Sequence, residues 1–158
     1  MDWGGTMRLL LDTNVVVDYA SQRGRYFPSA RLLVELAMVR EFDLWMSATQ
    51  ATDVFYLLSN GGRRSDVRGA REALRSLRSF LHIVSVTESD IDKALDADWE
   101  DFEDACVYYA ARKIKADAII ACNRKGFARS SIKVFDCDEL FAYLEREVGV
   151  SYAEVPWG

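Results

Sequence analysis

Cysteine and histidine are both scarce in this chain of 158 residues. The three cysteines, Cys106, Cys122 and Cys137, are odd in number and lie far apart without a C-x-x-C pair, which argues against a disulfide framework and a thiolate zinc site. A reducing, cytoplasmic setting is expected. His82 is the only histidine, and its place next to a predicted strand suits a structural role. We therefore expect no Ser/His/Asp or Cys/His arrangement for nucleophilic catalysis.

Long apolar segments are also missing. The first residues, MDWGGTM, contain no basic stretch followed by a long apolar run, and no later segment approaches the roughly 18 apolar residues that a membrane span requires. We expect a soluble protein that is neither secreted nor inserted in a membrane. The formal net charge of −5 disfavours nonspecific coating of nucleic acid, yet it is compatible with an acidic site that metal ions neutralise.

The composition is that of a folded domain, with 50% hydrophobic and 12% aromatic residues. The chain length fits one hydrophobic core, because single cores are usually built from roughly 100 to 200 residues. We predict a single domain over residues 1–158, in which residues 1–6 form an extension ahead of the first strand and residues 149–158 form a C-terminal tail. The tail is a candidate for oligomer contacts, and a homodimer is expected.

Short apolar segments that suit buried strands alternate with longer segments of helical periodicity. Strands are predicted at residues 8–11, 42–46, 83–86, 118–121 and 134–135, and helices at 15–20, 30–39, 48–58, 65–81, 101–115 and 138–148, with a further helix after Thr87. The predicted N-terminal caps are Ser47, Thr87 with Asp90, and Asp138. This alternation predicts an α/β fold, a three-layer α/β/α sandwich with a central parallel sheet of four to five strands.

Acidic and amide side chains are predicted near the carboxyl ends of the strands, where this fold binds ligands. Asp12 follows the first strand, Asn123 follows the fourth, and Asp104 opens the helix that leads into the fourth. Ligands of parallel sheets bind beyond the carboxyl ends of the strands. Asp53 lies within an apolar helix, where a buried carboxylate needs a partner or a metal. Carboxylate oxygens suit Mg²⁺ or Mn²⁺, although Asp12 also suits a helix cap and Asp104 a charge that the helix dipole favours.

Four segments around these residues together resemble the PIN domain family. They are LLLDTNVVVD, SATQATDVFYLL, DFEDACVYYAA and AIIACNRKGF, and their order and spacing match across roughly residues 8–145. The resemblance implies a metal-dependent endoribonuclease that hydrolyses RNA with Mg²⁺ or Mn²⁺. Many small bacterial members are toxins that an antitoxin protein neutralises, and the resemblance implies the same role for this chain.

The resemblance also assigns roles to single residues. It makes Asp12 the first metal ligand and Asp104 the third, with Asp53 where many members have glutamate. Asn14 would orient neighbouring groups or substrate, and Asp101 would be an acid that supports the ligands without being one of them.

The fourth segment departs from the family. Many members have a threonine near Ala121 and an acid at the position of Asn123 or Gly126, and this chain has neither acid. Asn123 can offer a carbonyl oxygen or hydrogen-bond a metal-bound water, but it carries no charge. We therefore expect weakened metal affinity.

A stripe of arginines borders the apolar face of the predicted helix 65–81. Its members recur at steps of four and three and are Arg64, Arg68, Arg71, Arg75 and Arg78. The stripe is either a solvated flank, with Glu72 as an ion-pair partner for Arg68 or Arg75, or an RNA-binding rim that contacts phosphates.

Two other functions remain open from the sequence. The first is a PIN-like module that binds RNA or protein without cutting, which the missing acid at Asn123 and Gly126 favours. The second is a phosphotransfer domain of the receiver or dehalogenase type, which also has an aspartate after its first strand. Asn14 and Asn123 disfavour it, because they stand where those enzymes need an acid and a lysine.

Overall fold

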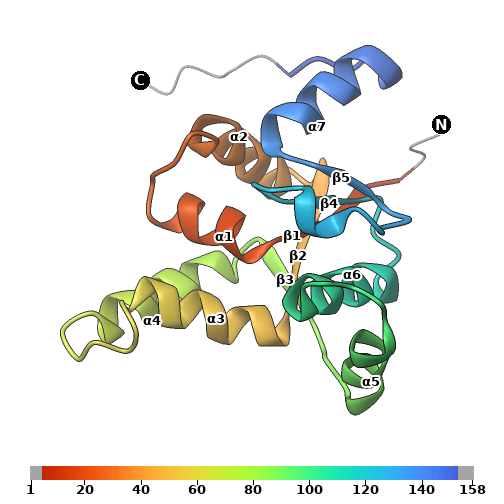
Figure 1. Ribbon diagram of the computed structural model, residues 1–158. Coiled ribbons are helices and arrows are strands. Elements are labelled where there is room, and N and C mark those ends of the chain that lie inside the picture. The colour runs from red at the N-terminus through yellow and green to blue at the C-terminus, as the bar shows by residue number, and fades with distance from the viewer. Residues whose placement is uncertain (1–4, 153–158) are drawn as a thin grey trace, which may run out of the picture.

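A five-stranded parallel sheet forms the centre of the protein. We describe a computed structural model over residues 5–152. The strands lie in the order β3-β2-β1-β4-β5, with bounds β1 (Met7–Leu11), β2 (Phe42–Ser47), β3 (Leu81–Val84), β4 (Ala118–Ile120) and β5 (Lys133–Phe135). β1 is the central strand and pairs with β2 on one side and β4 on the other (Figure 1). The predicted parallel sheet is confirmed.

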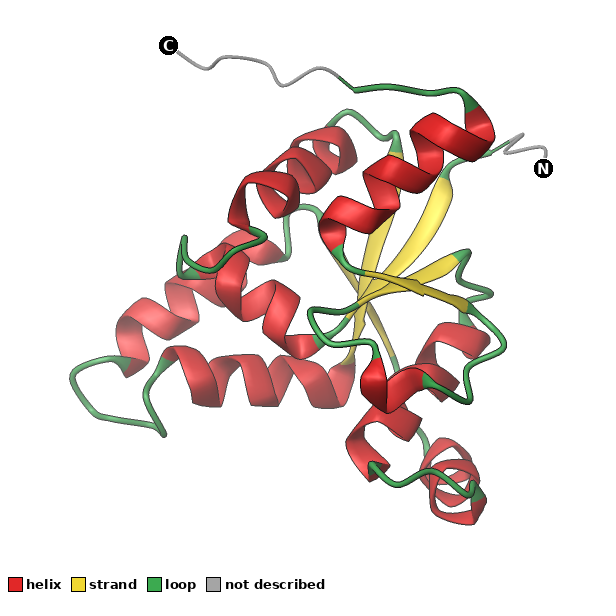
Figure 2. Cartoon of the chain, turned by 45° about the horizontal axis from the view of Figure 1, so that its top comes forward, coloured by secondary structure: helices red, strands yellow, loops and turns green. Residues whose placement is uncertain are grey.

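Helices cover both faces of the sheet, because alternate residues of each buried strand point to opposite sides. Leu9 and Leu11 pack into a cluster with α1 (Thr13–Ala20), α2 (Phe27–Met38) and α7 (Cys137–Tyr143). Leu10 packs into a second cluster with α6 (Phe102–Lys113). Figures 1 and 2 show these helices on the two sides of the strands, which confirms the three-layer α/β/α architecture.

A pair of helices connects β2 to β3. α3 (Ala48–Leu58) begins at the carboxyl end of β2 with a capping box at Ser47, within the predicted bounds, and α4 (Val67–Leu77) returns to β3. The prediction of one helix over residues 65–81 is wrong at its end, because the chain leaves the helix after Leu77 and Leu81 becomes the first residue of β3. Both leucines are buried, so the apolar periodicity runs across the turn without marking it.

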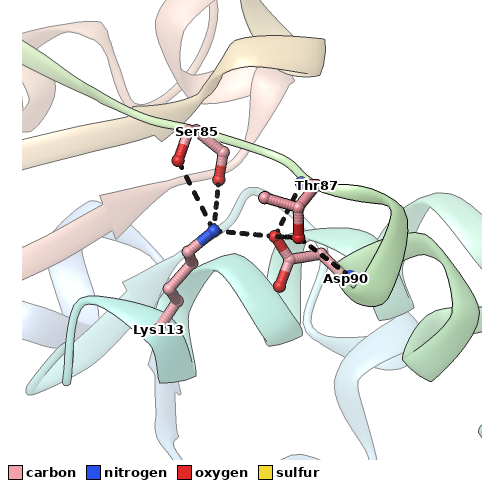
Figure 3. A network of polar contacts seen from close by, with 4 residues as sticks. All are labelled: Ser85, Thr87, Asp90 and Lys113. Carbon is pink, nitrogen blue, oxygen red and sulfur yellow. Dashed lines mark hydrogen bonds and ion pairs between the residues drawn. The ribbon is translucent and has the colours of Figure 1, made fainter.

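A polar network fastens α5 (Glu88–Asp96) to α6 (Figure 3). The predicted capping box is present, since Oδ2 of Asp90 accepts a hydrogen bond of 2.8 Å from the backbone N–H of Thr87. The same oxygen accepts from Nζ of Lys113 at 2.8 Å, and Lys113 also donates to the carbonyl oxygen of Ser85 at 3.0 Å. One ammonium group thus joins the C-terminal end of α6 to the start of α5 and to the segment that follows β3.

The last helix begins earlier than predicted. Asp136, not Asp138, is the N-cap, because its carboxylate accepts a 2.8 Å hydrogen bond from the backbone N–H of Glu139. Asp138 lies in the first turn and accepts a hydrogen bond from the hydroxyl of Ser29. Both aspartates precede the same apolar positions, so local sequence does not distinguish them. α7 then continues as a π-helical turn, η2 (Leu144–Val148).

The two chain ends are described only in part. Most of the predicted extension, residues 1–4, and residues 153–158 of the predicted tail lie outside the described residues. Within the described tail, the ring of Tyr152 packs 6.0 Å from those of Phe42 and Phe141, measured between centroids. Among residues 5–152, no helix has the length and apolar character needed to cross a membrane.

Candidate active site

A cleft of about 570 Å³ opens at the carboxyl edge of the sheet. Its lining comes from the start of α1, the exposed face of α3, parts of α5 and α6, and the loop after β4. The predicted site residues in this lining are Asp12, Asn14, Asp53, Asp101, Asp104 and Asn123. Segments that are distant in sequence therefore meet in one cleft.

Asp12 connects the central strand to α1 and is held on both sides. Its backbone N–H donates to the carbonyl oxygen of Ile120 at 2.8 Å, and its carboxylate caps α1 by accepting from the N–H of Thr13 at 2.9 Å. Burial raises the pKa of the Asp12 carboxyl, and the negative charges of Asp101 and Glu103 raise it further, against the Thr13 hydrogen bond. Asp12 is thus both a helix cap and part of an acidic group.

Asp104 lies in the first turn of α6. Its backbone N–H donates to Oδ1 of Asp101 at 3.0 Å, so Asp101 is the N-cap of the helix. Burial raises the pKa of Asp104 to about 6, and the charges of Asp12, Asp101 and Glu103 contribute to the rise. The fold therefore brings Asp104 and Asp12 near enough to repel each other, although they come from different parts of the chain.

Glu103 is a fourth member of this group that the sequence analysis did not single out. It is exposed and lines the cleft, and its charge raises the pKa of both Asp12 and Asp104. The signal was present in the run Asp101-Phe102-Glu103-Asp104, which places three acids at the start of one helix. We call Asp12, Asp101, Glu103 and Asp104 the acidic cluster.

Asp53 lines the same cleft from α3. The expectation that Asp53 is buried is wrong: it lies on the exposed face of α3, whereas its neighbour Val54 is fully buried. The charge of Asp53 is not among the causes that shift the pKa of Asp12 or Asp104. The sequence does not reveal which face of α3 is exposed, because Tyr56 and Leu57 on that face are themselves apolar.

Gln50 fixes the start of α3 against the end of β1. Its side chain is 3% exposed, and its Nε2 donates to the carbonyl oxygen of Leu11 at 2.8 Å. Its Oε1 accepts from the backbone N–H of Ser47 at 2.8 Å, which completes the capping box of α3. Gln50 was not among the predicted site residues, although the spacing Ser-x-x-Gln at the helix start is the signature of such a box.

The donors in the cleft suit a hard divalent cation, which prefers carboxylate oxygens. Repulsion among the carboxylates of the acidic cluster is relieved when a cation binds between them. In the part of the chain that the structure describes, no three His, Cys, Asp or Glu side chains are already arranged to hold a metal ion.

Comparison with known proteins identifies the family. A family model of the PIN domain matches residues 8–125. The chain belongs to the PIN domain family. It is also similar to Ribonuclease VapC1 of Aquifex aeolicus, with 26% identity over 137 residues that cover 84% of this chain and 92% of that protein.

Solved structures support the same fold. The VapBC2 structure from Rickettsia felis, bound to a DNA fragment from its promoter, matches with a TM-score of 0.64 and 16% identity, covering 82% of this chain and 98% of that one. VapC20 of Mycobacterium tuberculosis, described as a sarcin-ricin loop cleaving toxin, matches with a TM-score of 0.59 and 19% identity, covering 77% and 94%. At these identities the likeness establishes the PIN fold.

The fourth segment of this PIN domain lies against the acidic cluster. Asn123 is exposed in the cleft lining, and its Oδ1 accepts from the backbone N–H of Lys125 at 3.0 Å. Gly126 lies directly beside Asp104, and a Cβ atom added to the glycine would overlap Oδ2 of that carboxylate. Asn14, two residues after Asp12, is exposed and also lines the cleft.

The remaining polar candidates lie elsewhere. None of the five arginines lines the cleft; all are exposed, and Nη1 of Arg78 donates to the carbonyl oxygen of Leu81 at 2.8 Å. Within residues 5–152, Glu72 forms no ion pair with Arg68 or Arg75. His82 is exposed on β3 and packs on Trp45, with ring centroids 4.8 Å apart, outside the cleft lining.

Proposed function

We propose that this PIN domain is a divalent-metal-dependent endoribonuclease that hydrolyses RNA phosphodiester bonds in the cytoplasm. The supporting observation is the meeting of Asp12, which follows β1, and Asp104, in the first turn of α6, in one open cleft at the carboxyl edge of the sheet. The similarity to Ribonuclease VapC1 over most of both chains supports RNA as the substrate.

In this proposal Asp12 and Asp104 hold Mg²⁺ or Mn²⁺, and Asp53 contributes a third carboxylate from the wall of the cleft. An ion held there would supply an activated water and would offset the charge that develops on the leaving oxygen. Asp101 orients Asp104 through the backbone of α6, and Glu103 adds negative charge at the rim.

Two amides complete the proposed site. Asn14 and Asn123 lie in the same cleft lining as the acidic cluster, as uncharged groups that can hydrogen-bond substrate or water. The five arginines remain a proposed contact for RNA that extends beyond the cleft, since phosphate contacts from arginine are independent of sequence.

We further propose that the protein is the toxin of a toxin–antitoxin pair, because several structures of the same fold are complexes of this kind. A groove of about 610 Å³ between α1, α2 and α4 suits the antitoxin, since Tyr19, Met38 and Phe80 line it with apolar surface. Arg31 and Glu35 stand in the same lining. This combination fits an amphipathic helix laid into a groove. A homodimer is also part of the proposal.

The test is cleavage of RNA by the purified chain with Mn²⁺, with Mg²⁺ and with a chelator. Asp12→Asn and Asp104→Asn are expected to reduce cleavage below detection while circular dichroism stays unchanged. Asp92→Asn, an exposed acid of α5 outside the cleft lining, is the matched control and should cleave normally. Cleavage that survives both substitutions would refute the assignment.

The alternative is a module that binds RNA or protein without cutting, which the absence of an acid at Asn123 and Gly126 favours. Calorimetric titration with Mn²⁺ separates the two. If the protein is a nuclease, we expect it to bind Mn²⁺ and expect Asp104→Asn to abolish that binding. The binding module predicts RNA affinity with no heat of metal binding and no cleavage.

A further inference from the structure

Exposed apolar side chains gather at the proposed active-site cleft. Six large hydrophobic residues are exposed among those described, and three of them line this cleft: Tyr56 at 61%, Leu57 at 45% and Phe102 at 43%. Aromatic rings left in water forgo the free energy that burial would provide. Their concentration in one cleft indicates a ligand that covers them.

The two aromatic rings are attached to the segments that carry the acids. Tyr56 follows Asp53 by three residues on α3, so both side chains lie on the same exposed face of the helix. Phe102 is the first residue of α6 and stands between Asp101 and Glu103. One ring therefore comes from α3 and the other from α6, two of the helices that line the cleft.

The charges of the cleft make the rings necessary for binding RNA. Its described lining contains five carboxylates, Asp12, Asp53, Asp101, Glu103 and Asp104, and neither lysine nor arginine. A phosphate backbone therefore finds no basic side chain among the described residues that line the cleft. Stacking of bases on aromatic rings is an attraction that does not depend on charge and that every base can make.

We propose that Tyr56 and Phe102 position the substrate by stacking on bases next to the scissile phosphate. This proposal rests on the proposed nuclease function. Bases of a duplex are already stacked on each other and cannot offer their faces to the protein, whereas unpaired bases can be splayed onto aromatic side chains. Leu57 and Ile91 extend the apolar surface beside the rings.

A second copy of this chain is the other candidate to cover the same surface, since Tyr56 and Leu57 are neighbours on one exposed helix face. The two occupants differ in what a substitution changes. Loss of an RNA contact alters RNA affinity and leaves the mass of the protein in solution unchanged. Loss of a dimer contact alters the mass.

The test compares Tyr56→Ala and Phe102→Ala with Leu95→Ala, a control on α5 that is 64% exposed and lies outside the cleft lining. Fluorescence anisotropy in a chelator, where the proposed nuclease does not cut, measures the affinity for a labelled unpaired oligoribonucleotide and for the same strand in a duplex. Each aromatic substitution should weaken binding of the unpaired strand about tenfold, the usual loss of one stacked base. Tyr56→Phe should restore wild-type affinity, and the Kd for Mn²⁺ should not change.

Three results would overturn the proposal: equal affinity of the wild type for duplex and unpaired RNA, aromatic variants that bind like Leu95→Ala, or a fall in sedimentation mass with unchanged RNA affinity. The third would identify a second copy as the occupant. RNA affinity is measured apart from cleavage, so a wild type that binds unpaired RNA without cutting it would refute the nuclease and leave the stacking role supported.

Discussion

The carboxylate of Asp104 fills the space that a side chain at position 126 would occupy. A Cβ atom on Gly126 would overlap Oδ2 of Asp104. The glycine is therefore required for space. Many members of the family have an acid at this position or at that of Asn123, and its absence here leaves room for the carboxylate that comes from α6.

Gly126→Asp should therefore lower activity, although it adds the acid that many relatives have. The new side chain must push Asp104 away from Asp12, so we expect at least a tenfold loss in kcat/KM, with weaker Mn²⁺ binding, and a similar loss for Gly126→Ala. Gly69→Ala is the control, because a Cβ on that helical glycine meets open space and Ala favours the helix. Gain of activity in Gly126→Asp would show that Asp104 readily moves aside.

The burial of Asp104 and its repulsion by the acidic cluster should be visible as a dependence of stability on pH. An unfolded aspartate has a pKa of 3.8, and folding raises that of Asp104 to about 6, so the folded state holds the proton more tightly. Stability is then greatest below pH 4 for this group and falls as the pH rises through 6. In a chelator, the wild type should lose on the order of 1 kcal/mol more than Asp104→Asn over this window, after allowance for solvent screening.

Thermal melts at pH 4 and pH 7.5 measure this difference, and Asp92→Asn serves as the control for general charge. Mn²⁺ at pH 7.5 should restore the wild type and leave Asp104→Asn unchanged, because the ion replaces the lost proton as the neutralising charge. Identical pH profiles for the wild type and Asp104→Asn would mean that neither burial nor repulsion raises the pKa of Asp104 in solution.

The network between α5 and α6 should act with the opposite sign. Hydrogen bonds from Lys113 and Thr87 lower the pKa of Asp90 to about 2, so the stability that it contributes is present above pH 4 and is lost as the pH falls through 2. Lys113→Ala should destabilise the protein by about 1 kcal/mol at pH 7, the usual size for a charge-assisted hydrogen bond that is partly exposed. Urea denaturation measures it, with Lys93→Ala on α5 as the control. Equal stability of Lys113→Ala and Lys93→Ala would show that the network does not stabilise the protein.

Local signals explain which elements the sequence predicted. The capping residues Ser47 and Thr87 mark helix starts within a few residues, so both helices begin where expected. Asp12 and Asp104 follow a strand and open a helix, and parallel topology then brings them to one edge. Asp136 was overlooked because Asp138 stands in the same local pattern, and only the hydrogen bond to Glu139 separates them.

Features that depend on contacts between distant segments were not visible. Asp53 seemed buried because its neighbours are apolar, and the exposure of Tyr56 and Leu57 follows from the cleft that α3 and α6 form together. Glu103 acts on Asp12 across the fold, which no spacing in the sequence reveals. A single sequence reports which residues are apolar but not which apolar surface is left open for a ligand.

The Gln50 amide directly links α3 to β1, the strand that leads into Asp12. Gln50→Ala leaves the carbonyl oxygen of Leu11 and the N–H of Ser47 without these partners in a buried setting, and we expect a loss of about 1–3 kcal/mol in urea denaturation. Gln50→Glu keeps the acceptor for Ser47 but turns a carboxylate toward the Leu11 carbonyl, so it should be no more stable than Gln50→Ala at pH 7.

The same substitutions separate a positioning role from simple destabilisation. At a temperature where every variant is folded, Gln50→Ala should lower kcat by about tenfold, since small displacements of a site are costly, while the RNA affinity conferred by the exposed rings changes little. Thr52→Ala, on the exposed side of the same helix, should match the wild type in both assays. If Gln50→Ala is less stable yet keeps full kcat, the link to Leu11 stabilises the fold without aligning the wall of the cleft with Asp12.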